Sequence, residues 1–170
     1  YVNVWAHITH FRVPSDTVFA ERFSDLKVDE SLFGPYMKTN KFDICRDEWG
    51  LEVDPCMRNY LADIWSLDAA IGRLLKKLDQ LGLSENTIVV FTSDQGPARN
   101  TLNTLKPNQA GDKTRANMMG WAKGFRGGKH EMYEGGVRIP FVVRWPGKIP
   151  SGRVNHSSIL SGLDFLPTLC

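Results

Sequence analysis

The feature that most constrains the fold of this chain is a long helical pattern followed at once by a short β-branched run. Between about Pro55 and Leu81, apolar side chains recur at steps of three and four and form one stripe: Leu61, Ile64, Leu67, Ile71, Leu74, Leu75 and Leu78. Asp54 is the predicted N-cap, Pro55 suits the first helical position, and Gly82 suits a left-handed cap at the other end. We therefore predict a single long helix whose role is to cover a sheet.

Three segments have the pattern of strands. Residues 86–92 form a continuous apolar run between turn-forming residues, which is typical of a strand in the middle of a parallel sheet, buried on both faces. Residues 1–7 alternate apolar and polar side chains, and residues 139–145 predict a further strand with Pro140 at its start or on a sheet edge. Strand, long helix and strand make a βαβ unit, so the predicted class is α/β, a mainly parallel sheet with helices packed on it. Residues 13–54 show little periodicity and predict a long loop region with short helices.

Composition excludes several classes of function. Hydrophobic residues make up 42% and charged residues 24%, as in an ordinary globular protein, and 170 residues suffice for one compact domain. The formal charge is only +2, and the Lys and Arg residues are scattered, so we expect no nucleic-acid surface and no polybasic membrane anchor. No apolar run approaches the roughly 18 residues that a membrane span needs.

The chain begins at Tyr1 without an initiator Met and stops at Cys170 inside an apparent helix start. Natural domains usually end in exposed, weakly packed segments, so we expect residues 1–170 to be a fragment, and the absence of a leader says nothing about compartment. The three cysteines match no zinc or CxxC pattern. Cys45 and Cys56 allow two interpretations, a disulfide in an exported protein or two buried thiols.

The first candidate site residues directly follow the predicted strand at 86–92. Asp94 offers a carboxylate and Gln95 an amide oxygen, which are hard donors suited to Ca²⁺ or Mg²⁺. Ligands of open α/β sheets bind beyond the carboxyl ends of the strands, and Gly96 lets the backbone turn away sharply. The alternative is a plain turn in which Asp94 accepts hydrogen bonds from nearby backbone amides.

Two Gly-Gly pairs, at 127–128 and 135–136, surround Lys129. Paired glycines let a backbone approach a ligand closely, and a Lys among them can deliver a point charge to an anion. The spacing is not that of a Walker loop. The alternative is a pair of tight turns with a solvated Lys129. Glu134 and Arg138 are predicted to pair with each other or with backbone rather than to act in catalysis.

His7 and His10 stand at the end of the predicted opening strand. Either imidazole can act as a general acid or as a hydrogen-bond donor to an anionic leaving group. A His near a strand end is also commonly a satisfied polar residue, so both interpretations remain open.

Together these segments resemble the sulfatase family of the alkaline-phosphatase-like superfamily. The resemblance covers residues 1–14 and 55–170, and it is carried by the order and joint presence of five motifs, at 86–97, 126–129, 134–140, 144–147 and 164–168. It implies that residues 1–170 are the C-terminal portion of a single sulfatase catalytic domain, with part of an alkaline-phosphatase-like sheet.

The resemblance also implies a chemistry. The family members are hydrolases of sulfate monoesters that depend on Ca²⁺, with Mg²⁺ as the alternative to Ca²⁺. Their nucleophile is formylglycine, which is made from Cys or Ser. Asp94 and Gln95 match the metal ligands, although many members have Asn or His at the second position. Lys129 matches the catalytic lysine that binds the sulfate. His10 resembles the His that binds the ester oxygen and protonates it, but the residues after it depart from the family pattern, so His7 is the alternative.

Two features of the family are absent from the chain. The nucleophile motif, a Cys or Ser followed by any residue, Pro, any residue and Arg, does not occur, and neither do the paired acidic ligands near the family's N-terminus. We therefore predict that residues 1–170 alone hydrolyse nothing. The expected substrate of the whole enzyme is a sulfate-ester small molecule or a sulfated glycan, in a periplasmic, secreted or lysosomal setting by family analogy. A phosphodiester or phosphonate hydrolase of the same superfamily and a non-catalytic truncated paralogue are the alternatives.

Overall fold

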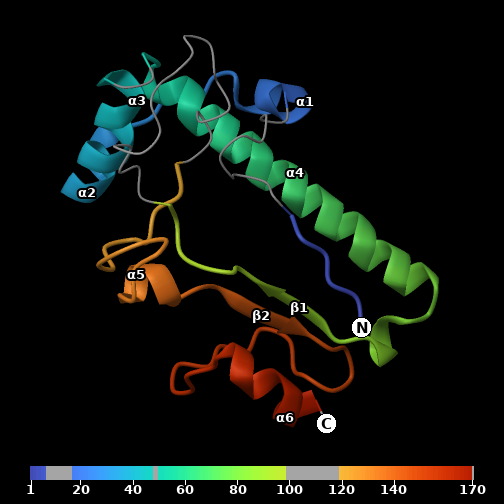
Figure 1. The fold of residues 1–170 in the computed structure, drawn as a ribbon. Helices are drawn as coiled ribbons and strands as arrows, with labels where there is room; N and C mark the ends of the chain where they lie inside the picture. Colours follow the sequence, from blue (N-terminus) through green and yellow to red (C-terminus); the bar gives the residue numbers. More distant parts are fainter. Residues whose placement is uncertain (7–16, 48–49, 99–118, 170) are drawn as a thin grey trace.

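The computed structural model describes residues 1–6, 17–47, 50–98 and 119–169 of the chain. Helices and strands both occur among these residues (Figure 1). The described elements are, in chain order, α1 (Thr17–Ala20), η1 (Glu21–Phe23), η2 (Glu30–Leu32), α2 (Pro35–Met37), η3 (Lys38–Phe42), α3 (Asp43–Asp47), α4 (Val53–Gln80), η4 (Ser84–Asn86), β1 (Val89–Thr92), α5 (Glu134–Val137), β2 (Phe141–Arg144), η7 (Gly162–Asp164) and α6 (Phe165–Leu169).

The long helix α4 is confirmed, but it begins earlier than predicted. Val53 is its first residue and Glu52 its N-cap, so the prediction that Asp54 caps the helix is wrong. The Asp54 carboxylate instead accepts hydrogen bonds from the Val28 backbone N–H at 2.9 Å and from Lys27 Nζ at 3.1 Å. These two partners come from a segment 26 and 27 residues upstream, which the local helix pattern does not reveal.

The other end of α4 is as predicted. Gly82 has φ +66°, and the Leu83 N–H reaches back to the Leu78 carbonyl at 3.0 Å, which is the hydrogen bond of a left-handed helix cap. The predicted apolar stripe is only partly covered, because Ile64 and Leu74 remain 41% and 46% exposed. The helix packs chiefly against α1, η1, α3 and η4, so the prediction that it covers a sheet is not confirmed.

The predicted strands at 86–92 and 139–145 are present as β1 and β2. They pair antiparallel, from Val89 opposite Arg144 to Thr92 opposite Phe141, so the sheet of the described residues is not the predicted parallel one. With one partner strand, β1 is not buried on both faces, and Phe91 is 41% exposed. Residues 1–6 are exposed and form no strand, which contradicts the predicted opening strand over this part.

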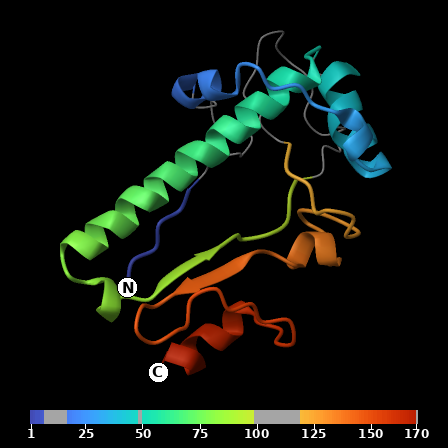
Figure 2. The same cartoon turned by 180° about the vertical axis from the view of Figure 1, so that it is seen from behind.

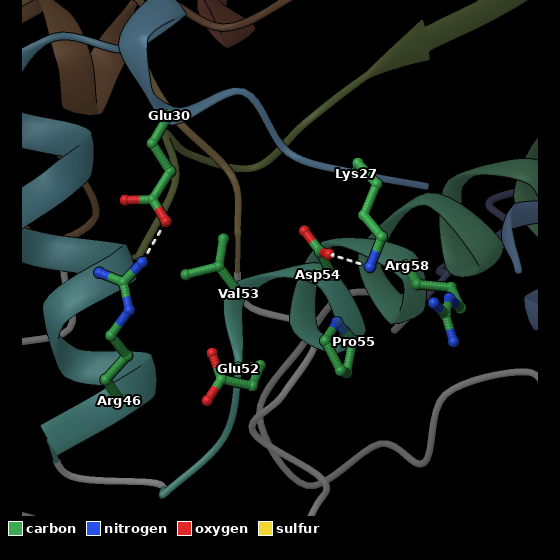
Figure 3. Close-up of a pocket in the computed structure, with 8 residues that line it drawn as sticks. All are labelled: Lys27, Glu30, Arg46, Glu52, Val53, Asp54, Pro55 and Arg58. Carbon is green, nitrogen blue, oxygen red and sulfur yellow. Dashed lines mark hydrogen bonds and ion pairs between the residues drawn. The ribbon is translucent and has the colours of Figure 1, made fainter. Parts of the chain in front are cut away.

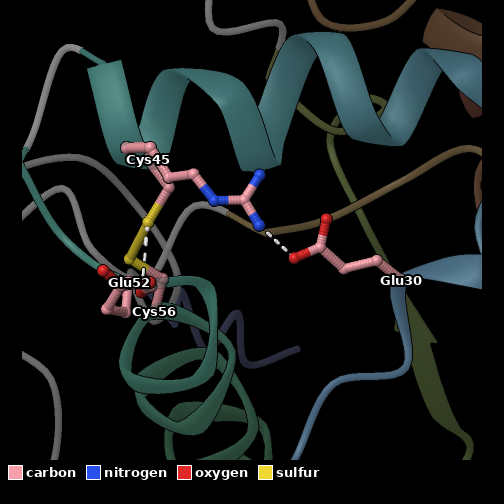
Figure 4. Close-up of a disulfide and its surroundings, with 5 residues drawn as sticks. Glu30, Cys45, Glu52 and Cys56 are labelled. Atoms are coloured by element: carbon pink, nitrogen blue, oxygen red, sulfur yellow. Dashed lines mark hydrogen bonds and ion pairs between the residues drawn. A yellow bond between two sulfur atoms is a disulfide. The ribbon is translucent and has the colours of Figure 1, made fainter.

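Among the described residues, the hydrophobic core surrounds the first turns of α4. Short helices fill much of the segment that sequence patterning predicts to be mainly loop, and they gather at this end of α4 (Figures 1 and 2). The core cluster consists of Met37, Phe42, Cys45, Val53, Cys56 and Met119. Cys45 of α3 and Cys56 of α4 form a disulfide within this core, which decides between the two interpretations of the cysteines (Figure 4).

The C-terminal segment turns back onto β2. Ser161 and Asp164 form a reciprocal capping box at the start of η7, and α6 follows directly. The ring of Phe165 contacts the ring of Phe141 edge-on, with centroids 5.6 Å apart. Among the described residues, no helix combines the length and the apolar character that crossing a bilayer would require.

Candidate active site

The pairing of β1 with β2 brings the two candidate segments together. Thr92 ends β1 and lies opposite Phe141, which begins β2. The segment that leaves β1, residues 93–98, therefore starts at the same end of the strand pair as the segment that enters β2. A hydrogen bond from Thr92 Oγ1 to the Pro140 carbonyl, at 2.9 Å, closes this end.

Three hydrogen bonds then hold the two segments side by side. The Gly96 N–H donates to the Gly136 carbonyl at 2.8 Å, and the Lys129 N–H donates to the Pro97 carbonyl at 2.9 Å. The His130 N–H donates to Gln95 Oε1 at 3.3 Å. The residues singled out after β1 thus lie next to the lysine singled out between the glycine pairs.

Four glycines make this close approach possible, and we call Gly96, Gly127, Gly135 and Gly136 the glycine joint. A Cβ on Gly96 would overlap the Gly135 carbonyl oxygen, and one on Gly135 would overlap that of Gly127. A Cβ on Gly136 would overlap the carbonyl oxygens of Glu131 and Gly128. In the described residues, therefore, the paired glycines allow backbone to approach backbone, whereas the sequence suggested that they allow backbone to approach a ligand.

Asp94 is held in its ionised form. Its Oδ2 accepts a hydrogen bond from Gln95 Nε2 at 3.1 Å. The pKa of the Asp94 carboxyl is lowered chiefly by this hydrogen bond and further by its own and the Gln95 backbone amides and by the charge of Lys129, against a smaller opposing effect of burial. Asp94 thus accepts the backbone hydrogen bonds of the plain-turn interpretation and also lies within electrostatic reach of Lys129.

The loop that carries Lys129 is fixed on both sides of it. The Gly128 N–H donates to Glu131 Oε2 at 3.0 Å, and the Glu131 N–H donates to the Gly128 carbonyl at 3.0 Å. His130 adopts φ +71°, a left-handed backbone conformation that is uncommon outside glycine and concentrated at functional sites. Sequence patterning did not identify Glu131 or His130, because nothing local marks a carboxylate that closes a turn or a residue with positive φ.

Glu134 and Arg138 pair with each other, as predicted. Arg138 Nη1 lies 2.9 Å from Glu134 Oε2, one turn apart across α5. The Arg138 guanidinium also lies over the Phe125 ring, 4.6 Å from its centroid. Both charged groups are thus engaged in holding the loop around α5.

The described residues supply only part of a metal site. Asp94 is an ionised hard oxygen donor, which fits Ca²⁺, but Ca²⁺ takes six to eight oxygen ligands. Gln95 Oε1 accepts the His130 N–H, and one lone pair of that amide oxygen remains for a second partner. Over the described part of the chain, no three His, Cys, Asp or Glu side chains form a group that could hold a metal. His7 and His10 lie outside the described residues.

A hollow of about 480 Å³ lies at the start of α4 and is lined by none of the residues just described (Figure 3). Three cations and three carboxylates line it with Val53 and Pro55: Lys27, Arg46, Arg58, Glu30, Glu52 and Asp54. Lys27 pairs with Asp54 and Arg46 with Glu30, while Arg58 donates to the Phe23 and Ser24 carbonyls. All three cations are engaged by protein groups, so this hollow is not a ready anion site.

Beyond β1 the structure thus places an ionised carboxylate, that of Asp94, within electrostatic reach of Lys129. The sulfatase family model matches residues 11–170 of this chain. The chain belongs to the sulfatase family.

Individual relatives match over about three fifths of the chain. An N-acetylgalactosamine-6-O-sulfatase of Bacteroides thetaiotaomicron is 38% identical over 107 residues, which are 62% of this chain and 19% of the relative. Steryl-sulfatase of Mus musculus is 40% identical over 111 residues (65% and 16%), and arylsulfatase A of Homo sapiens is 41% identical over 106 residues (62% and 18%). The matched part thus spans less than a fifth of the length of these relatives.

Proposed function

We propose that this chain forms the cation- and sulfate-binding part of an enzyme that hydrolyses sulfate monoesters. Membership of the sulfatase family supports the reaction class. One matching relative is named for a sulfated amino sugar, which supports carbohydrate sulfates as the substrate class. The mainly parallel sheet expected for this superfamily would belong to the whole protein.

This proposal rests on one observation: two motifs that are distant in the sequence, the segment after β1 and the loop of Lys129, lie next to each other in the structure. The Lys129 N–H donates to the Pro97 carbonyl at 2.9 Å, three residues after Asp94, and the Lys129 charge helps to lower the pKa of the Asp94 carboxyl. A cation site and an oxyanion site can therefore lie next to each other here. Sulfate-ester cleavage develops negative charge on the equatorial and leaving oxygens, which a fixed lysine stabilises.

Each residue then has a role in this proposal. Asp94, with Gln95 beside it, would hold a Ca²⁺ ion, which supplies electrostatic stabilisation of the sulfate oxygens when it is bound. Lys129 would donate hydrogen bonds to the sulfate. His10, or alternatively His7, would act as a general acid and protonate the departing ester oxygen. General-acid catalysis of this kind raises the reaction rate by about 10²–10⁴-fold. The nucleophile, expected to be formylglycine, would come from outside residues 1–170.

The disulfide supports an exported enzyme. Disulfides persist in oxidising compartments and are rare in the reducing cytosol. Cys45 and Cys56 are both fully buried and joined at the centre of the core, so the bond belongs to the packing of the chain. A periplasmic, secreted or lysosomal location is consistent with this bond.

Binding measurements on the protein expressed from its complete reading frame test the two roles. We expect Asp94→Asn to weaken Ca²⁺ binding at least tenfold and Lys129→Met to weaken sulfate binding at least tenfold, both measured by calorimetry. Asp68→Asn and Lys76→Met change exposed residues of α4 and serve as charge-matched controls that should keep both affinities. Unchanged Ca²⁺ affinity in Asp94→Asn would contradict the metal role, and unchanged sulfate affinity in Lys129→Met the anion role.

Turnover assays test the reaction. The sulfate and phosphate monoesters and the phosphodiester of one phenol should be compared, and we expect the complete protein to prefer the sulfate. Preference for a phosphate ester would instead support the related phosphodiester or phosphonate hydrolase, and no turnover of any ester would support a non-catalytic paralogue. Residues 1–170 alone should turn over none of them, because they contain no nucleophile motif. Turnover by the 170-residue chain would refute that expectation.

A further inference from the structure

Lys41 is a buried cation that reaches from the helical core to the candidate site. It lies on η3, its residue is only 1% exposed, and its Nζ donates a hydrogen bond to the Ala98 carbonyl at 2.7 Å. The two residues are 57 positions apart in the chain. Lysine is almost never fully buried without a polar partner, so this placement needs a reason.

The carbonyl that Lys41 binds belongs to the segment that follows β1. Pro97 and Ala98 are consecutive, and their carbonyls accept hydrogen bonds from the Lys129 backbone and from Lys41 Nζ, respectively. The Gly96 N–H is bound to Gly136 just before them. The segment that begins with Asp94 is therefore held from the Lys129 side by two backbone hydrogen bonds and from the core by Lys41.

The element that carries Lys41 is itself well fixed. Phe42, the next residue, is completely buried in the core cluster, and Cys45 lies one helical turn further on. The disulfide of Cys45 joins this helical run to Cys56 of α4. The backbone that carries Lys41 is thus fixed both by core packing and by the disulfide.

We propose that Lys41 is a positioning residue, which fixes the Asp94 segment against Lys129 by holding the Ala98 carbonyl. A methionine would fill similar space in this core without any need for a polar partner. Burial lowers the pKa of the Lys41 ammonium to about 7, because the charged group loses its hydration. A lysine at this position therefore carries a desolvation cost that a methionine would not. The catalytic consequence rests on the proposed function, whereas the contact with Ala98 does not.

Amide hydrogen exchange measures this positioning without any assay of catalysis. In Lys41→Met we expect the Gly96 and Lys129 amides to exchange at least tenfold faster, while amides in the middle of α4 change less than twofold. Lys41→Arg keeps an N–H donor and should restore slow exchange at least in part. Lys38→Met removes a half-buried lysine from the same helical turn and should leave both amides unchanged.

Equal exchange of the Gly96 and Lys129 amides in Lys41→Met and the parent would overturn the inference. A uniform acceleration of all amides would also overturn it, because it would show general destabilisation. Should Lys41→Met fail to fold, Lys41→Gln retains a shorter donor and is expected to accelerate the same two amides selectively. Selective acceleration in a protein that binds neither Ca²⁺ nor sulfate would leave the positioning intact and reject the proposed function instead.

In the complete enzyme, the same variants separate positioning from mere packing. Lys41→Met should lower kcat at least tenfold and change KM less than threefold, since a misplaced Asp94 segment affects the reacting geometry more than general binding. Lys41→Arg should recover part of kcat. Equal kcat values in Lys41→Met and the parent would count against the inference.

Discussion

Burial controls how the charge of Lys41 responds to pH. Its pKa in the folded chain is about 7, below its ordinary value of 10.5, because the ammonium has lost its hydration. Between these two values the unfolded chain binds more protons than the folded chain, so the free energy of unfolding rises with pH across this window. Below about pH 7 both states are protonated and the full penalty of the buried charge remains.

We therefore expect the free energy of unfolding to rise by about 2 kcal/mol between pH 7 and pH 9. Urea titrations at both pH values measure this change, and Lys41→Met should make it vanish. The other described groups with resolved shifts titrate outside the measured interval from pH 7 to pH 9. The carboxyl pKa values of Asp29, Asp54, Asp79 and Asp94 are lowered, and the pKa of Tyr60 is raised. The same pH response in the parent and in Lys41→Met would contradict this prediction.

The candidate site residues differ in how clearly the sequence marks them as functional. Asp94 and Gln95 stand out because they directly follow a recognisable strand, and Lys129 because glycine pairs flank it. The role of Lys41 is not predictable in this way, since it depends on a carbonyl 57 residues away. Hydrogen bonds over such separations leave no local pattern.

At the scale of elements, long periodic segments are predicted well and short ones poorly. The C-terminal cap of α4 follows from Gly82, and both strands follow from their apolar runs. The helices of residues 17–32 have three or four residues each, which is too short for a repeating apolar face. The helical run of residues 35–47 passes through the π-helix η3, which breaks the 3.6-residue period that marks an α-helix. The direction of the β1–β2 pair is likewise not contained in either strand, because both parallel and antiparallel pairs accept apolar runs.

The glycine joint gives a test at this scale. We expect Gly136→Ala to destabilise the chain by about 2–3 kcal/mol, because its Cβ would meet backbone atoms that cannot move aside independently. Gly72→Ala is the matched control on α4, where nothing lies within 4 Å of the added Cβ, and it should stabilise by about 0.5–1 kcal/mol. Urea midpoints of both variants give the comparison, and a neutral Gly136→Ala would show that the backbone contact is not tight.

Many large apolar side chains of the described residues lie on the molecular surface. Among them are Trp5, Ile159, Leu163 and Leu166, each more than 70% exposed. Apolar surface of this extent favours association in water.

We expect the 170-residue chain in isolation to self-associate at micromolar concentration. Sedimentation velocity measures this, and the double substitution Ile159→Lys and Leu163→Lys should reduce the associated fraction. Leu32→Lys adds a single charge on an exposed side chain of η2, and it should have a smaller effect than either Ile159→Lys or Leu163→Lys alone. A chain that stays monomeric throughout the concentration series would show that these side chains do not drive association.

At Gly96, Gly135 and Gly136 the closest neighbours are main-chain atoms, so this part of the glycine joint is insensitive to the identity of the side chains around it. Arg126 and Met132 lie on exposed positions of the same loop, so libraries that randomise them would alter the rim while leaving these contacts in place. Directed evolution toward new esters should therefore tolerate broad diversity at these two positions and almost none at the three glycines.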